Sequence, residues 1–172
     1  AKVIKQLAVL DWNQLSKDQR LHLIRVYGLT LCRLGEATES TQAPIRRLGQ
    51  YFPVNDEQLD RELAKLLVAV KADGATVKIV DKLLTPSAQE PQIAYAMILS
   101  DAQTGWNNAS REKYFRWFVE SAKTKGGNSF GGYISNIKKH AVEKLSNQEK
   151  EALAEVLALK PEVSDPYADL KA

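Results

Sequence analysis

The chain has 172 residues, and its 24 Lys and Arg residues against 21 Asp and Glu residues give a formal net charge of +3. With 44% hydrophobic and 26% charged residues it has the composition of a folded globular protein, which excludes collagen-like and low-complexity chains. No apolar run approaches the roughly 20 residues that a membrane-spanning helix needs, and the single cysteine, Cys32, excludes an internal disulfide framework.

The first strong element in chain order is a helix predicted over 17–34. Ser16 and Gln19 have the spacing of a capping box at its start, and a glycine follows its end. The apolar residues of this segment fall on more than one side, so we expect the helix to lie between neighbours. In that setting Cys32 is expected to be a buried, inert thiol rather than a catalytic nucleophile.

Two helices are predicted next, over 41–51 and 56–71. Pro44 is expected in the first turn of the shorter helix, where a proline is tolerated. Asn55 is the expected N-cap of the longer one. Its apolar residues recur at helical spacing, with Asp60 among the polar positions outside that stripe, and the stripe consists of Leu59, Leu63, Leu66, Leu67 and Val70.

The second half of the chain continues the helical pattern. Helices are predicted over 75–84, 91–102 and 111–123, the last of them capped by Asn108 or Ser110. After the glycine-rich residues 125–132, another helix is expected to end near residue 145. Ser146 and Glu149 then form a second capping box at the head of a last helix.

No segment alternates as a β-strand does, so the predicted fold class is all-α. The pair 41–51 and 56–71 and the pair 75–84 and 91–102 recur at the spacing of HEAT-type repeats. We therefore expect a HEAT-like helical repeat, a right-handed α-solenoid of about eight helices, as a single domain over residues 1–160. Residues 161–172 contain two prolines and few apolar residues, which indicates a linker or tail.

The residues that usually carry chemistry are sparse. His22 and His140 are the only histidines, and no second thiol accompanies Cys32, so no metal site is predicted. Cys-x-x-Cys-His is absent, which excludes covalent attachment of a c-type haem to this segment by the usual motif. The glycine-rich run lacks the Lys-Ser/Thr of a phosphate loop. It is expected to be a tight interhelical turn, with a backbone anion site as the alternative.

Seven of the thirteen aromatic residues lie within positions 106–133. On the helix over 111–123, Phe115 and Phe118 belong to the predicted buried stripe, whereas Tyr114 and Trp117 fall on its flank. This group can be a packed core, an interface with a partner, or a stacking platform for nucleic acid or sugar, and its members are Trp106, Tyr114, Phe115, Trp117, Phe118, Phe130 and Tyr133.

No carboxylate pair or nucleophile–base set stands out, so the residues favour a non-catalytic helical scaffold. An enzyme with a lone cleft acid of raised pKa is a minor alternative. The main alternative is a nucleic-acid-binding helical repeat, because basic residues can contact phosphates. The cations it would use are Arg46, Arg47, Lys78, Lys82, Lys113, Arg116, Lys138 and Lys139.

Residues 89–153 resemble a known protein arrangement. Three motifs are similar to the segment that joins HEAT-like repeats to a C-terminal c-type cytochrome domain. They are the stretch from Arg111 to Phe118, the sequence Gly-Gly-Asn-Ser-Phe at 126–130, and Ile134-x-x-Ile137-Lys138. That arrangement occurs in large secreted or periplasmic proteins of planctomycetes, verrucomicrobia and bacteroidetes. Those proteins often begin with a β-propeller similar to sorbosone dehydrogenases.

The resemblance implies a structural or docking module of a larger haem-containing, oxidoreductase-like protein in the periplasm or outside the cell. It implies no cofactor in this segment, with haem c in an adjoining domain, and neighbouring domains or a protein as partners. The sequence opens at Ala1 without a signal segment, which favours a piece of a longer protein. The signature residues carried over by position are Trp106, Arg111, Tyr114, Trp117, Phe118, Gly126, Gly127, Ser129 and Phe130.

Overall fold

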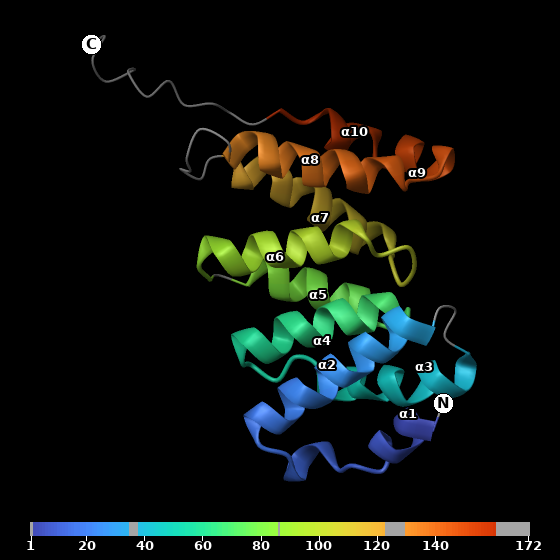
Figure 1. Cartoon of the computed structure of the whole chain (residues 1–172). Helices are drawn as coiled ribbons and strands as arrows, with labels where there is room; N and C mark the ends of the chain where they lie inside the picture. The colour runs from blue at the N-terminus through green and yellow to red at the C-terminus, as the bar shows by residue number, and fades with distance from the viewer. Residues whose placement is uncertain (1, 35–37, 86, 123–129, 161–172) are drawn as a thin grey trace. The chain divides into compact units, whose positions relative to one another are not determined.

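The structure is a computed structural model, and it describes residues 2–34, 38–85, 87–122 and 130–160 (Figure 1). Helices and turns account for the regular structure in these ranges, without a strand, so the predicted all-α class is confirmed. Within them, no helix combines the length and the apolar character needed to cross a bilayer. The chain divides into two compact units, residues 1–106 and residues 107–172.

Unit 1 consists of six α-helices and two short 3-10 helices over its described residues. Helix α4 lies at its centre, in contact with α2, α5 and α6, and α5 packs along α6. The leucines of the predicted α4 stripe are buried, as the 3.6-residue periodicity indicates. The elements are α1 (Lys2–Leu7), η1 (Trp12–Gln14), α2 (Lys17–Leu34), α3 (Glu39–Arg46), η2 (Arg47–Tyr51), α4 (Glu57–Ala69), α5 (Ala75–Leu84) and α6 (Gln89–Ser100).

Unit 2 is smaller and is organised around the aromatic helix α7. Both α8 and α10 contact α7, and α9 contacts α10. The expected last helix is divided at Leu153, where one short helix ends and the next begins. The elements are α7 (Asn108–Ser121), α8 (Phe130–Glu143), α9 (Asn147–Ala152) and α10 (Ala154–Ala158).

Two of the predicted helix starts are confirmed by reciprocal hydrogen bonds. The backbone N–H of Ser16 donates to Gln19 Oε1 at 2.8 Å, and the N–H of Gln19 donates to Ser16 Oγ at 3.3 Å. The same exchange joins Ser146 and Glu149 at the start of α9. Each pair satisfies two N–H groups that the first turn of a helix leaves without a partner.

Two other predicted caps are wrong by one residue. Asp56, not Asn55, caps α4, because its Oδ1 accepts the N–H of Leu59 at 3.1 Å, whereas Asn55 has a positive φ of 60°. Helix α7 is capped by Asn107, whose Oδ1 accepts the N–H of Ser110 at 2.8 Å. In both cases the cap is the last residue with extended backbone before the helix.

The predicted helix over 41–51 begins earlier than expected and changes type. Helix α3 starts at Glu39, so Pro44 is its sixth residue and lies beyond the first turn. A proline there removes one backbone donor, and the chain continues as the 3-10 helix η2 from Arg47. Arg46 holds this region against α4, since its Nε donates to the carbonyl of Val70 at 3.0 Å.

The expectation of a covered α2 and a buried Cys32 is wrong. Leu23, Ile24 and Tyr27 are buried, but Leu29 is 50% exposed, and the Cys32 thiol is exposed as well. Within unit 1 this helix packs on α4 and α1, which cover only part of its apolar circumference. An uncovered apolar strip therefore remains on α2.

Candidate functional site

Six of the nine signature residues are described by the structure, and they are divided between the two units. Trp106 ends unit 1, half-buried, and its indole Nε1 donates to the carbonyl of Ala102 at 2.8 Å. Gly126, Gly127 and Ser129 lie outside the described residues, as does most of the glycine-rich run. The remaining five belong to unit 2, where Phe130 is half-buried at the first position of α8.

The aromatic side chains of α7 form a packed cluster. The Phe118 ring meets the rings of Tyr114 and Trp117 edge-on, with both pairs of centroids 5.1 Å apart and interplanar angles of 78° and 76°. Such edge-to-face pairs are a favoured aromatic geometry. Tyr114 and Trp117 are buried together with Phe115 and Phe118, so the interpretation that the first two lie on a flank is wrong. The cluster is therefore a packed core and leaves little ring surface for stacking a ligand.

Arg111 joins α7 to α9. Its side chain is 12% exposed, and Nη1 lies 2.8 Å from Oε1 of Glu149. The other carboxylate oxygen of Glu149 accepts the N–H of Ser146 at 2.8 Å and its hydroxyl at 2.9 Å. The Ser146 backbone hydrogen bond is the main cause that lowers the pKa of Glu149, with the Arg111 charge adding to it. Arg111 thus serves the packing of unit 2.

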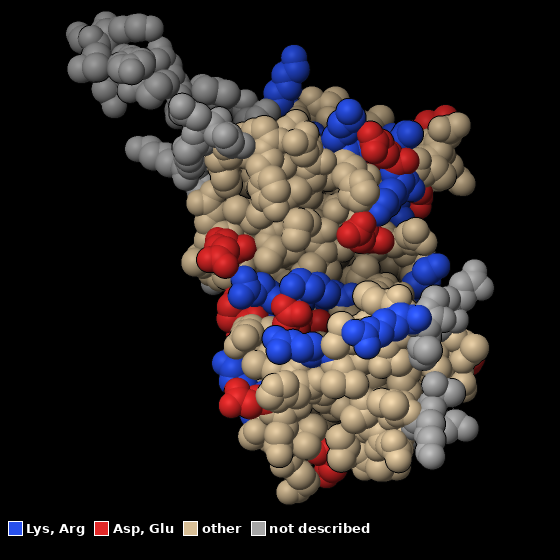
Figure 2. Space-filling view, in the orientation of Figure 1, with Lys and Arg blue, Asp and Glu red and all other residues tan. Residues whose placement is uncertain are grey.

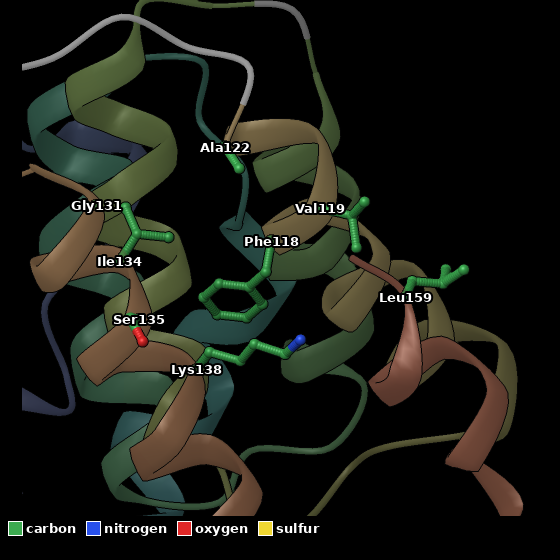
Figure 3. A pocket seen from close by; sticks show the side chains of 8 residues that line it. All are labelled: Phe118, Val119, Ala122, Gly131, Ile134, Ser135, Lys138 and Leu159. Atoms are coloured by element: carbon green, nitrogen blue, oxygen red, sulfur yellow. The ribbon is translucent and has the colours of Figure 1, made fainter. Parts of the chain in front are cut away.

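A pocket of about 210 Å³ opens between α7, α8 and the residue that follows α10. Figure 3 shows the Phe118 ring at its centre, with Ile134 on one side and Leu159 on the other. Phe118 is the one signature residue among the described ones that lines it. The full lining is Phe118, Val119, Ala122, Gly131, Ile134, Ser135, Lys138 and Leu159.

Two polar side chains of α8, Ser135 and Lys138, stand at this apolar pocket. Lys138 forms no ion pair or hydrogen bond with the residues that the structure describes. An apolar cavity beside an ammonium group accommodates an apolar side chain that carries or adjoins a carboxylate. Nothing in this arrangement pairs a nucleophile with a base.

Ser135 is not among the residues predicted from the sequence, and Lys138 is predicted only as a possible phosphate contact of the nucleic-acid alternative. Positions 131, 134, 135 and 138 have the spacing of one helical face. This spacing is visible in the sequence, but glycine at 131 and serine at 135 do not mark the face as an apolar one. Only the packing of α8 on α7 turns this face toward Phe118.

Four of the eight cations of the nucleic-acid alternative form contacts within the protein. Arg46 binds Glu39 at 2.6 Å, Lys78 donates to the carbonyl of Gly49 at 3.0 Å, and Arg116 binds Glu112 at 2.7 Å. Lys82 is paired with the buried carboxylate of Asp60. Moving these side chains to phosphates would break internal contacts.

No cluster of three or more potential metal ligands occurs in the described ranges. Both histidines are exposed. Comparisons with protein-family models, curated proteins and solved structures found no match to this chain.

Proposed function

We propose that the chain is a non-catalytic docking module of a larger, extracytoplasmic, haem-containing oxidoreductase-like protein, built as a HEAT-like right-handed solenoid. The pocket between α7 and α8 is the observation that carries the docking role. It lies beside the aromatic cluster that bears the family resemblance. Its lining is mainly apolar, and the ammonium group of Lys138 forms no ion pair with a described residue. The proposed occupant is a segment of a neighbouring domain that presents an apolar side chain next to a carboxylate.

Two features of the chain support the module over the alternatives. Successive helices in unit 1 pack on one another, as α5 does on α6 and α4 on both, which is the local pattern of helical repeats. The signature side chains Arg111 and Trp117 are used in packing, which fits a scaffold. A nucleic-acid interface is less favoured because Arg46, Lys78, Lys82 and Arg116, four of its eight cations, are already engaged in contacts within the protein.

The docking role is tested by photo-crosslinking in the parent protein, expressed with its native flanking sequence. A photoreactive side chain at Ser135 is expected to crosslink to a segment with an apolar residue beside Asp or Glu. The matched control is Asn136, which is exposed on the same helix and does not line the pocket. Equal crosslinking from both positions, or none from Ser135, contradicts the proposal.

A charge reversal separates the ionic part of this contact from the apolar part. Lys138→Glu is expected to weaken the crosslink, whereas Lys139→Glu, on an exposed neighbour that does not line the pocket, leaves it unchanged.

The parent protein itself is identified by reading the coding sequence on both sides of the segment. A Cys-x-x-Cys-His motif downstream and a signal peptide upstream are the expected result.

A further inference from the structure

A second apolar groove, of about 450 Å³, runs along unit 1 between α2 and α4. Its lining residues follow the same helical spacing on both walls, at i, i+4, i+7 and i+11. At the rise of an α-helix this amounts to about 16 Å, or three turns, along each wall. The walls are Leu21, Arg25, Gly28 and Cys32 on α2, and Gln58, Glu62, Lys65 and Ala69 on α4.

The floor of the groove is apolar and well packed, while its edge is open. Ile24 and Leu66 are each 4% exposed beneath it, and Leu29 at its edge is 50% exposed. A Cβ atom added at Gly28 would meet no atom within 4 Å, so the groove is empty above this residue. In Figure 2 positively and negatively charged side chains lie next to one another along the band where α4 and α5 run in Figure 1, and much of the surface below that band is uncharged.

Among the charged side chains that line the groove, one cation has no ion pair with a described residue. Glu62 and Lys65 pair with each other at 2.7 Å on α4. Arg25 is exposed and has no ion pair or hydrogen bond with any described residue. The edge of the groove on α2 is therefore positive, and a carboxylate is the group that complements it.

We propose that the α2–α4 groove binds an amphipathic helix of a protein partner, with the helix's apolar stripe on Ile24 and Leu66 and a carboxylate facing Arg25. Two helical walls of equal length present the ridges between which a third helix packs. Recognition of a helix in an apolar groove relies on anchors at i, i+4 and i+7, the spacing that both walls have. This interaction is separate from the pocket beside Phe118.

The test uses the full chain and two synthetic amphipathic peptides with the same leucine stripe. One peptide carries glutamates beside the stripe and the other carries lysines at the same positions. By fluorescence anisotropy at low ionic strength, the acidic peptide is expected to bind at least about fivefold more tightly than the basic one. Cys32 supplies a second readout, because an occupant of the groove slows alkylation of this single exposed thiol by N-ethylmaleimide.

Four substitutions in α2, one of them a control, test the site. Arg25→Glu is expected to reverse the preference, while Arg33→Glu, exposed on the same helix and outside the groove lining, leaves the order of the peptides unchanged. Gly28→Leu fills the empty space and is expected to abolish binding. Circular dichroism checks that both Gly28→Leu and Leu29→Asn fold. If Gly28→Leu does not fold, Leu29→Asn replaces it, because it removes an apolar contact at an exposed position and is expected to weaken binding.

Equal affinity for the two peptides, full affinity in the groove-filled variant, or failure of both peptides to bind overturns the proposal. Lys138→Glu separates this result from the proposed docking function, because it changes the pocket between α7 and α8 alone. Peptide binding is expected to be unaffected by that substitution.

Discussion

Lys82 Nζ on α5 lies 3.0 Å from Oδ2 of Asp60 on α4, and the Asp60 side chain has no exposed surface. The orientation makes this contact an ion pair rather than a hydrogen bond. The second oxygen, Oδ1, accepts the N–H of Val54 at 2.7 Å. One carboxylate therefore holds α4, α5 and the segment before α4 together. From helical spacing alone, Asp60 is predicted to lie among the polar positions outside the apolar stripe.

Removing the Asp60 carboxylate is expected to destabilise unit 1. Asp60→Ala leaves both the Val54 N–H and the Lys82 ammonium without this partner, which costs about 3 kcal/mol for a buried pair. Urea unfolding followed by circular dichroism measures the change. In a double-mutant cycle, Asp60→Ala combined with Lys82→Met is expected to cost less than the sum of the two single changes, whereas strict additivity would refute the coupling.

The stability of unit 2 is expected to depend on the ionisation of Glu149. Because the folded protein lowers the pKa of this carboxyl, its contribution is fully present above the ordinary glutamate pKa and is lost as pH falls through the folded value. Glu149→Gln is expected to lower the free energy of unfolding by about 0.5 kcal/mol near neutral pH, a small value because the pair is partly exposed. In acid, below the folded pKa, this difference disappears.

The matched control for this experiment is Glu151→Gln, on the same short helix at an exposed position. Its effect on stability is expected to be small and to vary little with pH. If Glu149→Gln lowered the free energy of unfolding by the same amount at every pH, the charge of the Glu149 carboxylate would not contribute to stability.

Trp117→Ala is expected to lower the stability of unit 2 markedly. The indole is 6% exposed and packs edge-on against Phe118, and truncation of a buried tryptophan costs about 3 kcal/mol or more. Trp117→Phe keeps an aromatic ring and is expected to cost clearly less. Thermal unfolding measures both variants, and crosslinking from Ser135 measures docking. If Trp117→Ala changed neither, the assignment of Trp117 to a structural or docking signature would be wrong.

Two glycine substitutions are expected to have opposite signs. Gly105 has a φ of 78°, and a Cβ there would lie 2.9 Å from Oγ1 of Thr76, which donates to the carbonyl of Thr104. Gly105→Ala is therefore expected to destabilise the protein by at least about 1 kcal/mol. Gly132 lies within α8 with open space at its Cβ position, so Gly132→Ala is expected to stabilise by roughly 0.5 to 1 kcal/mol. Melting temperatures that shift in the same direction contradict this prediction.

The sequence alone determined the helical class, both capping boxes and the burial of Phe115 and Phe118. These features depend on residues within about one or two turns of each other, so local spacing is sufficient to predict them. The one-residue errors at Asn55 and Asn108 have a local cause as well. Several adjacent polar residues can cap a helix, and the backbone conformation selects one of them.

Only the tertiary structure decided which apolar and charged side chains find a partner. Asp60 is buried because Lys82, 22 positions later, neutralises it. Trp117 is buried in a unit where α8 and α10 pack on its helix, while Cys32 is exposed on a helix that its neighbours cover only in part. Burial depends on contacts between segments far apart in the sequence, and helical periodicity does not specify which segments those are.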